Sequence, residues 1–489
     1  MRISSIIPCV RNANGSGHEQ RRQTDGPGKD EGNRMNDFRK TAQEMLEFIR
    51  ISPTCFHAVA NIGRMLEAAG FQQLQEKEEW KLEKGGRYYT ERNDSSVIAF
   101  VIPEKEVGIR GFHMAAAHSD SPCFKIKEKP ELTVEEHYLR LNTEKYGGMI
   151  LSTWLDRPLS VAGRLAVKNG NGIEGRLVNI DRDLCVIPNV AIHMNREMNK
   201  GVEYNPQVDL LPLLADVSFD EYDAHTTYDA QTASENAEEQ PEAVEKPTLT
   251  LAALAAETAG VDAETILGED LFLYTRQEGK MIGAKGEFVL SPRLDDLQSA
   301  FALTKAFTES TPAEYINVCA VFDNEEVGSG TRQGADSTFL EDILQRIAEG
   351  LQADHSSYLR WVADSFLISA DNAHAVHPNH PEKADPANRP YLNGGIVIKY
   401  HGSQKYTTDG ISAARMKDYC ERAKVPYQTY ANRSDIAGGS TLGNISTAHV
   451  SVSSVDIGLP QLAMHSAVET AGMKDTEYAV RALKEFWGE

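Results

Sequence analysis

The sequence predicts an α/β fold in which a main α/β domain is interrupted by an inserted, β-rich domain. Apolar strand-type runs alternate with helix-type segments over residues 35–127 and again over residues 285–489. Between these two parts, residues 128–284 carry short strand-type runs and two successive Asn-Gly turns at 169–172. With 489 residues, the chain is also longer than one simple hydrophobic core usually supports.

The amino-terminal part predicts a leader followed by patterned sequence. Residues 1–34 are polar and rich in Gly, Asn, Gln and Arg, so we expect a disordered leader there. Apolar residues that share one helical face begin directly after Met35. The elements predicted in this part are helices at 38–49 and 58–69 and strands at 96–102 and 114–117.

The inserted domain differs in composition and pattern from the sequence on either side of it. Residues 220–247 are acidic and poor in aliphatic side chains, which predicts a solvated, flexible segment within this domain. The remaining elements predicted here are strands at 159–167, 175–180 and 271–275 and a helix at 249–259.

The carboxyl-terminal part returns to alternating strands and helices. A glycine-rich turn at 438–443 separates two of its predicted elements. The predicted strands lie at 287–290, 315–322, 365–369, 395–400 and 450–457, and the predicted helices at 297–308, 338–350, 411–423 and 475–487.

Charge and cysteine usage exclude several classes of partner and compartment. The net charge of −22 argues against nucleic acid and anionic membranes as partners. The sequence has no apolar stretch that approaches the ~20 residues of a membrane span. The six cysteines are scattered without a C-x-x-C spacing, which is typical of reduced thiols in a cytoplasmic protein.

Four polar residues follow the predicted strand at 315–322, and they are Asp323, Asn324, Glu325 and Glu326. Acids at the end of a buried parallel strand lie where open α/β sheets bind their ligands. One of two adjacent carboxylates can hold a metal while the other faces the substrate as a general base. Taken alone, a Glu-Glu pair is more often a polar cap on a strand. The other residues of metal-binding type therefore decide between a strand cap and a metal site.

Five predicted strand ends or turns carry residue types that bind metals. Each is unremarkable alone, because a single His is usually a satisfied core residue and an Asp often caps a helix. Jointly they supply the imidazoles and carboxylates that suit zinc, cobalt or manganese, including one acid that could bridge two ions. The residues are His118 with Asp120, Asp295, Glu325 with Glu326, Asp371, and His465.

The chain resembles the aspartyl aminopeptidase family, whose members are metallopeptidases with two co-catalytic zinc ions. Five motifs appear in the family's order, and the similarity runs from about Phe38 to Phe486. The motifs are His-Ser-Asp-Ser-Pro at 118–122, Ser-Pro-Arg-Leu-Asp at 291–295, Phe-Asp-Asn-Glu-Glu-Val-Gly-Ser at 322–329, Ser-Ala-Asp-Asn-Ala-His-Ala-Val-His-Pro-Asn at 369–379, and Gln-Leu-Ala-Met-His-Ser at 461–466.

This resemblance implies a fold and an assembly. The catalytic domain would be an α/β sandwich with a mixed sheet, formed by residues 35–127 and 285–489. The β-rich domain at 128–284 would make dimer contacts, and twelve subunits would form a closed homo-oligomer around the active sites.

The resemblance also implies a role for each motif residue. His118 and Asp371 would hold one metal ion, Glu326 and His465 the other, and Asp295 would bridge them. Glu325 would be the general base toward the attacking water, and Asp120 would orient a ligand imidazole. The implied substrate-binding residues are His193, which the inserted domain would lend to a neighbouring subunit, and Lys399, Tyr406 and Gly439.

The sequence thus predicts a zinc-dependent aminopeptidase that removes amino-terminal residues, preferably Asp or Glu, from peptides. A broad or neutral-residue aminopeptidase would share every metal ligand and differ only in its pocket. A non-catalytic assembly scaffold on the same fold would be expected to have lost ligands, and all of them are present here. A glycosidase that pairs Glu325 with another carboxylate would need no histidines, so stoichiometric metal would count against it.

Overall fold

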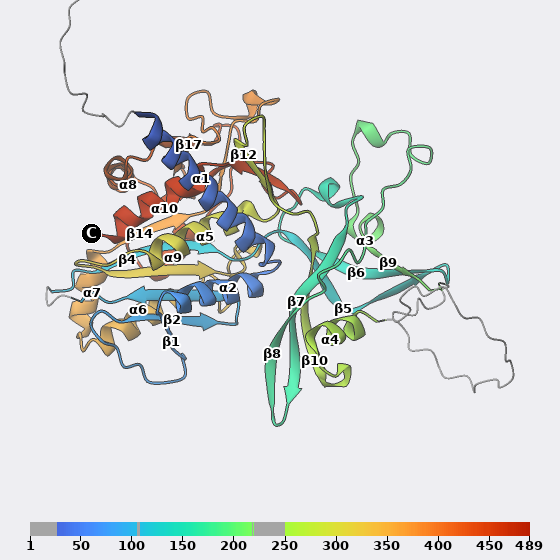
Figure 1. Ribbon diagram of the computed structural model, residues 1–489, viewed down its shortest axis with the longest axis horizontal. Helices are drawn as coiled ribbons and strands as arrows, with labels where there is room; N and C mark the ends of the chain where they lie inside the picture. The colour runs from blue at the N-terminus through green and yellow to red at the C-terminus, as the bar shows by residue number, and fades with distance from the viewer. Residues whose placement is uncertain (1–26, 105–107, 218, 220–249) are drawn as a thin grey trace, which may run out of the picture.

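The computed structural model describes residues 27–104, 108–217, 219 and 250–489. Figure 1 shows two lobes: an α/β lobe, built from residues before 119 and after 279, and a β-rich lobe, built from residues 123–275. The α/β class and the mixed sheet are therefore confirmed. The acidic segment predicted at 220–247 lies outside the described residues, as do residues 1–26 of the predicted leader.

The α/β lobe is organised around a nine-stranded mixed sheet. Its four central strands, β13, β4, β14 and β18, run parallel, and the strand next to them on either side, β3 or β16, runs antiparallel to them. In spatial order the sheet contains β1 (Gln72–Gln73), β2 (Arg87–Arg92), β3 (Ser96–Val101), β13 (Ile316–Phe322), β4 (Phe112–His118), β14 (Phe366–Ala370), β18 (Ser453–Gly458), β16 (Ile396–Tyr400) and β17 (Tyr427–Ala431).

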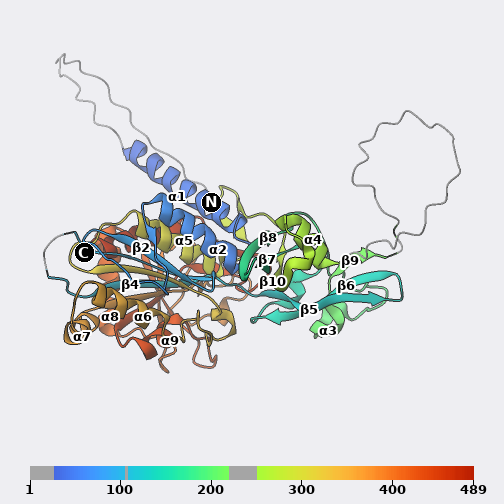
Figure 2. The ribbon, with the colours of Figure 1, turned by 90° about the horizontal axis from the view of Figure 1, so that it is seen from below.

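Both faces of this sheet are apolar, and helices cover each of them. Along β3, Val97 and Ala99 join the core on one face, whereas Ile98 and Phe100 join the core on the other. Figure 2 shows α1, α2 and α5 on one side of the sheet and α6, α7 and α9 on the other. The helices are α1 (Pro27–Arg50), α2 (Cys55–Ala68), α5 (Leu294–Thr308), α8 (Gly410–Ala423) and α10 (Asp475–Trp487) on the first face, and α6 (Phe339–Gly350), α7 (His355–Ala363) and α9 (Leu442–His449) on the second.

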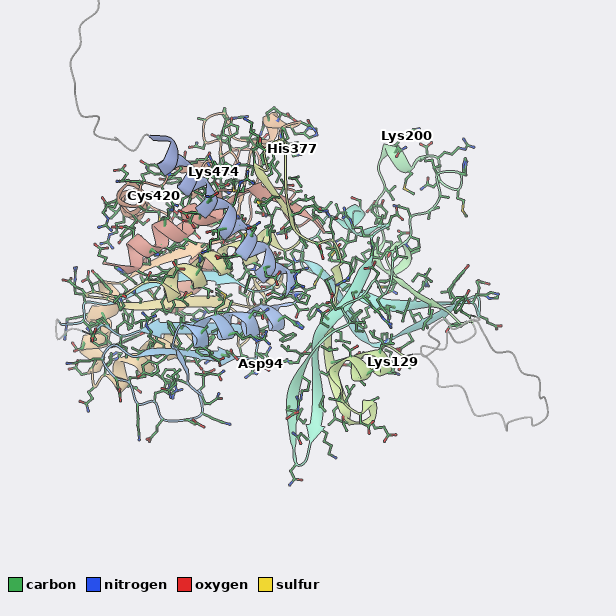
Figure 3. All side chains as sticks on the ribbon, in the orientation of Figure 1. Asp94, Lys129, Lys200, His377, Cys420 and Lys474 are labelled. Atoms are coloured by element: carbon green, nitrogen blue, oxygen red, sulfur yellow. The ribbon has the colours of Figure 1, made fainter. Side chains whose placement is uncertain are left out.

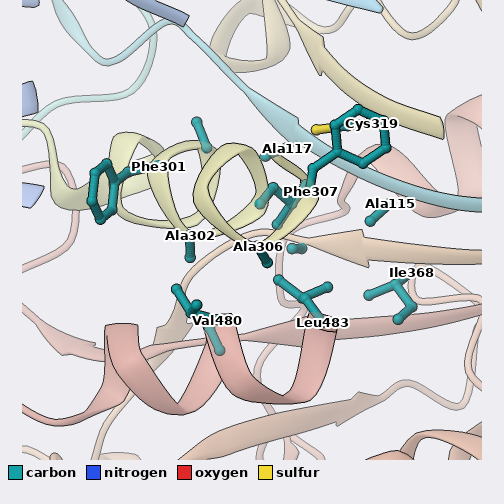
Figure 4. Close-up of a cluster of buried hydrophobic side chains, with 14 of the residues drawn as sticks. Ala115, Ala117, Phe301, Ala302, Ala306, Phe307, Cys319, Ile368, Val480 and Leu483 are labelled. Atoms are coloured by element: carbon teal, nitrogen blue, oxygen red, sulfur yellow. The ribbon is translucent and has the colours of Figure 1, made fainter. Parts of the chain in front are cut away.

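Helix α5 lies at the centre of the first face. Figure 4 shows Ala302 and Ala306 of α5 facing Val480 and Leu483 of α10. The small alanine side chains allow the two helices to approach closely, and Phe307 fills the space toward the sheet. This packing fixes the start of α5, which carries Asp295.

Helix α1 corrects the predicted boundary of the leader. It begins at Pro27 and not after Met35, so residues 27–34 are helical where we expected disorder. The sequence offers a reason: proline is favoured at the first helical position because its missing N–H needs no partner there.

The β-rich lobe is a six-stranded, wholly antiparallel sheet with the helix α4 (Leu251–Ala259) packed on it. A short helix, α3 (Pro206–Asp209), lies beside β6. In spatial order the strands are β8 (Gly172–Asn179), β7 (Leu159–Asn169), β10 (Ile266–Thr275), β5 (Cys123–Val134), β6 (Tyr138–Tyr146) and β9 (Leu213–Asp216).

A small third sheet joins distant segments of the α/β lobe. It contains β11 (Lys280–Ile282), β12 (Phe288–Ser291), β20 (Glu469–Gly472), β19 (Pro460–Leu462) and β15 (Ala373–His374). By sheet membership the chain enters the β-rich lobe between β4 and β5 and leaves it between β10 and β11. Both points lie a few residues before the predicted boundaries at 127/128 and 284/285. No described helix is long and apolar enough to cross a membrane.

Candidate metal centre

The predicted metal ligands gather at the carboxyl-terminal edge of the parallel strands. His118 is the last residue of β4, Glu325 and Glu326 follow β13, and Asp371 follows β14. Because parallel strands end at the same edge, these side chains meet there, as in other open α/β sheets. The start of α5 and the turn after β19 complete a cavity of about 350 Å³, whose lining includes His118, Asp295, Glu325, Glu326, Asp371 and His465.

Asp295 lies between the two histidines. Its Oδ1 is 3.5 Å from His118 Nε2, and its Oδ2 is 3.5 Å from His465 Nε2. The second imidazole also lies 3.4 Å from Glu326 Oε1. With both of its oxygens directed at different imidazoles, Asp295 has the arrangement of a carboxylate that bridges two cations.

Two groups of donor atoms share Asp295, and the donor atoms of each group lie within 4.8 Å of one another. The first contains His118, Asp371 and also Asp296, which the sequence analysis did not include; the second contains Glu326 and His465. Among the described residues, the buried Oδ1 of Asp295 and Oε1 of Glu326 have no hydrogen-bond partner. Buried carboxylate oxygens without a partner are costly, so this donor set fits bound divalent cations.

The carboxylate side chains that line the cavity carry more negative charge than its Lys and His side chains offset. Burial raises the pKa of Glu325 to about 7, with the His118 imidazole opposing the shift and the Asp371 carboxylate adding to it. Burial likewise raises the pKa of Glu326, and the charge of Asp295 adds to that shift. Bound cations would stabilise the ionised forms of these carboxylates.

Asp120 lies behind the first group, next to His118 and the Glu-Glu pair. It is 3% exposed, and its Oδ1 lies 3.4 Å from His118 Nδ1. The same carboxylate accepts hydrogen bonds from the backbone N–H of Glu325 at 3.1 Å and of Glu326 at 3.2 Å. One buried side chain therefore positions both an imidazole and the Glu-Glu pair.

Glu469 plays the corresponding part for the second group, and the sequence analysis missed it. One of its oxygens accepts a hydrogen bond from the backbone N–H of Asp295 at 3.0 Å, and the other from the backbone N–H of His465 at 2.8 Å. Its side chain bonds only to backbone atoms of these residues. The residue types near it in the sequence therefore gave little signal of its role, apart from its place four residues after His465.

Three of the four predicted substrate-binding residues line the same cavity: Lys399, Tyr406 and Gly439. Burial alone would lower the pKa of Lys399, but the Asp371 carboxylate, 3.5 Å from its Nζ, and the charges of Tyr406, Asp456 and Asp295 together outweigh burial and raise that pKa. Sequence reasoning did not single out other wall residues such as His374 and Tyr430. His374 could have been found, because it lies within the motif that carries Asp371.

The fourth residue, His193, lies elsewhere. It is exposed in the loop between β8 and α3 of the β-rich lobe, and it is not among the described residues that line the cavity of its own chain. Figure 3 shows Lys200, in the same loop, on a part of the lobe that projects away from the α/β lobe. The expectation that His193 reaches a neighbouring subunit stays a prediction.

Comparisons with known proteins agree with this geometry. The family model of the aminopeptidase I zinc metalloproteases (M18) matches residues 48–487. A probable M18 family aminopeptidase 2 of Clostridium novyi (strain NT) is 47% identical over 450 residues, which cover 92% of this chain and 98% of that protein.

Two solved structures show the same fold. A chain in the cryo-EM structure of the Ape4 and Nbr1 complex is 36% identical, with a TM-score of 0.84 over 92% of this chain and 86% of that one. The mApe1 dodecamer of S. cerevisiae is 25% identical, with a TM-score of 0.75 over 92% and 97% of the two chains.

Proposed function

Since the chain belongs to the M18 family of metal-dependent aminopeptidases, we propose that it removes acidic amino-terminal residues from peptides at the centre around Asp295. The observation that carries this proposal is the position of Asp295 between two histidines. Its Oδ1 lies 3.5 Å from His118 Nε2, and its Oδ2 lies 3.5 Å from His465 Nε2. Peptide hydrolysis at such a centre needs a water molecule, a base to take its proton and a site for the free amine.

The donor set supports two divalent ions per chain. His118 and Asp371 would hold one ion, Glu326 and His465 the other, and Asp295 would bridge them. Imidazole and carboxylate donors suit zinc, and cobalt or manganese could replace it. When bound, the two ions would acidify a water molecule, polarise the scissile carbonyl and receive the free amino group of the substrate.

The chain's own residues would perform the proton transfers and hold the substrate. Donor atoms of Glu325, His118 and Glu326 also lie within 4.8 Å of one another. Glu325 belongs to neither group that contains Asp295 and lines the cavity beside them, so it would accept the proton of the attacking water. The same group could then return that proton to the leaving amine. Asp120 would keep Glu325 in place through its hydrogen bond to the Glu325 backbone N–H at 3.1 Å.

We propose that Lys399 causes the preference for Asp and Glu. It is the one Lys or Arg among the described residues that line the cavity. We expect an amide of Asp or Glu to be cleaved about tenfold or more faster than one of Leu, because a charge-assisted hydrogen bond contributes about 1.5–3 kcal/mol. A panel of amino-terminal residue amides, assayed with and without a chelator, measures this. Loss of all activity with the chelator is expected, and faster cleavage of Leu would contradict the acidic preference.

One observation favours a neutral-residue aminopeptidase as the second candidate. Lys399 Nζ lies only 3.5 Å from Asp371 Oδ2, so part of its charge is already neutralised. If the His193 of a neighbouring subunit does not add a second cation, the pocket has little with which to select a carboxylate. The same amide panel separates the two candidates, since both would require the metal ions.

We expect the protein to form a large closed homo-oligomer, and twelve subunits is the proposed number because the related mApe1 of S. cerevisiae is a dodecamer. Exposed apolar side chains on the β-rich lobe support self-association, and they include Val190, Ile192 and Met194 in the loop that carries His193. Light scattering should give a particle about twelve times the 54.0 kDa chain mass. A stable, active monomer would contradict this expectation.

A cytoplasmic location is proposed from the cysteines. All five cysteines in the described part of the chain are free thiols, and four of them are buried. Burial raises the pKa of the Cys319 thiol, for example, which keeps it protonated and unreactive. Free thiols persist in reducing compartments, which supports this location.

A further inference from the structure

The end of β6 and the turn that follows it belong to the β-rich lobe, yet they contact the residues around both ligand groups. We propose that this segment, residues 146–150, positions the metal ligands, so that the β-rich lobe is a structural part of the metal centre. The inference rests on the proposed function, because it assumes that His118, Glu326 and His465 hold ions. It goes beyond that function by assigning positioning residues in the other lobe.

Tyr146 is the first contact. Its hydroxyl donates a hydrogen bond to Asp120 Oδ2 at 2.7 Å and accepts one from Asn324 Nδ2 at 2.8 Å. Because the hydroxyl is engaged as donor and as acceptor, its orientation is fixed. The Asp120 carboxylate in turn lies beside His118 Nδ1 and accepts the backbone N–H groups of Glu325 and Glu326.

The loss of the Tyr146 hydroxyl would remove one of the two hydrogen-bond donors to Asp120 Oδ2 and leave that oxygen only the backbone N–H of Glu326, among the described residues. Asp120 is 3% exposed, so bulk water has little access to replace the missing donor. A carboxylate that loses one donor can rotate toward its remaining partners. Rotation of the Asp120 side chain would disturb its hydrogen bonds with the backbone N–H groups of Glu325 and Glu326. It would also withdraw Oδ1 from His118 Nδ1, which would then keep only its hydrogen bond to the backbone carbonyl of Asp120 at 3.1 Å.

The carbonyl of Gly148 is the second contact. It accepts a hydrogen bond from His465 Nδ1 at 2.5 Å, which leaves Nε2 of that ring toward Asp295 and Glu326. The backbone N–H of Ile150 also donates to the carbonyl of His465 at 2.9 Å. These bonds hold a residue whose φ of 65° lies in the left-handed region, which is unusual for histidine.

Gly147 makes the third contact, through its lack of a side chain. Its φ is +78°, and a Cβ placed on it would lie 3.1 Å from Glu326 Cβ and 3.5 Å from Glu326 Oε2. Any side chain at this position would therefore press on a proposed metal ligand. The close approach of the turn to Glu326 requires glycine.

The competing explanation is ordinary packing between lobes. The ring of Tyr146 does pack edge-on against Phe272, with 5.6 Å between ring centroids. A packing role predicts that substitutions in the segment lower the stability of the protein and leave the affinity for metal unchanged. A positioning role predicts weaker metal binding in a protein that is still folded.

The decisive variant is Tyr146→Phe, which keeps the ring and its contact with Phe272 and removes only the hydroxyl. Removal of a partner that orients a metal ligand typically weakens metal binding by ~10–100-fold, and we expect a loss in this range. Titration of the metal-free full-length chain with zinc, followed by calorimetry, measures it. The matched control is Tyr138→Phe, at the exposed opposite end of the same strand, which should bind zinc as the wild type does.

Activity gives a second readout that a packing defect would not produce. We expect the activity of Tyr146→Phe at low zinc to fall and to recover as the zinc concentration is raised. Gly147→Ala provides an independent variant in case Tyr146→Phe does not fold. It should weaken the binding of zinc by the group that contains Glu326. Its control is Gly170→Ala, because Gly170 also has a positive φ, +59°, but has no atom within 4 Å of the added Cβ.

The outcomes separate this inference from the function on which it rests. Wild-type protein that binds no divalent ion would overturn the proposed function and the inference with it. Wild-type protein that binds two ions, alongside folded Tyr146→Phe and Gly147→Ala variants of unchanged zinc affinity, would overturn the inference alone. Weaker zinc binding by either variant, with both controls unchanged, is the result expected.

Discussion

Replacement of Glu325 by Gln is expected to lower the rate of peptide hydrolysis by ~10²–10⁴-fold and to leave the metal content near that of the wild type. Gln keeps the shape of the side chain but cannot accept a proton from water. The substitution does not change the backbone N–H of residue 325, which donates a hydrogen bond to Asp120 at 3.1 Å. Activity and metal analysis on the same purified sample measure both parts of the expectation.

Glu326→Gln is the matched comparison, because it makes the same chemical change one residue later. Glu326 Oε1 lies 3.4 Å from His465 Nε2 and belongs to the second ligand group, so this variant should lose metal along with activity. If Glu325→Gln loses metal while Glu326→Gln retains it, the two roles are reversed. Full activity in both variants would mean that the pair only caps β13.

Asp295→Asn should have the larger effect on metal binding, because Asp295 belongs to both ligand groups. Its carboxylate is the one that faces both histidines, and a neutral amide cannot offer two charged oxygens. We expect the loss of affinity for both ions to exceed the ~10–100-fold that removal of an outer partner costs, with activity lost in parallel. Metal analysis after dialysis measures the loss.

A control is needed to show that Asp295→Asn is folded, since the residue is buried at 2% exposure. Asp364→Asn is suitable, because Asp364 pairs with Arg110 on the surface of the α/β lobe. Both variants should show the circular dichroism of the wild type. A folded Asp295→Asn variant that retains two ions would mean that Asp295 does not bridge them.

The sequence predicted the central strands of the large sheet, because their composition depends on burial, but it did not predict β1, β2 and β17 toward the sheet edges. The runs at 96–102 and 315–322 differ from the observed strands by one residue at one end, and the run at 365–369 differs by one residue at each end. Residues buried on both faces must be apolar and are mostly β-branched, so a short window is sufficient to recognise them. The metal-type residues at the ends of these strands were found for the same reason.

Elements with one exposed face were harder to predict. Strand β5 (Cys123–Val134) was missed because Lys and Glu alternate along it, Pro130 interrupts it, and its pairing with β6 shifts between Ile126 and Glu131. Helix α9 (Leu442–His449) was missed because it begins inside the glycine-rich turn that we predicted at 438–443. In both cases tertiary contacts override a weak local signal.

The parts of the site that sequence could not predict act through the backbone. Glu469 accepts hydrogen bonds from the backbone N–H groups of Asp295 and His465. Gly148 contacts the His465 ring through its backbone carbonyl. Every residue type has a backbone C=O and every type except proline has a backbone N–H, so such contacts leave little signature in the sequence.

The central claim, that Asp295 bridges two metal ions, is tested most directly by a crystal structure of the zinc-loaded protein with anomalous data collected at the zinc edge. We predict two anomalous peaks per chain, one beside His118 and Asp371 and the other beside Glu326 and His465, with an oxygen of Asp295 within ligand distance of each. A single peak, or two peaks of which only one contacts Asp295, would contradict the claim.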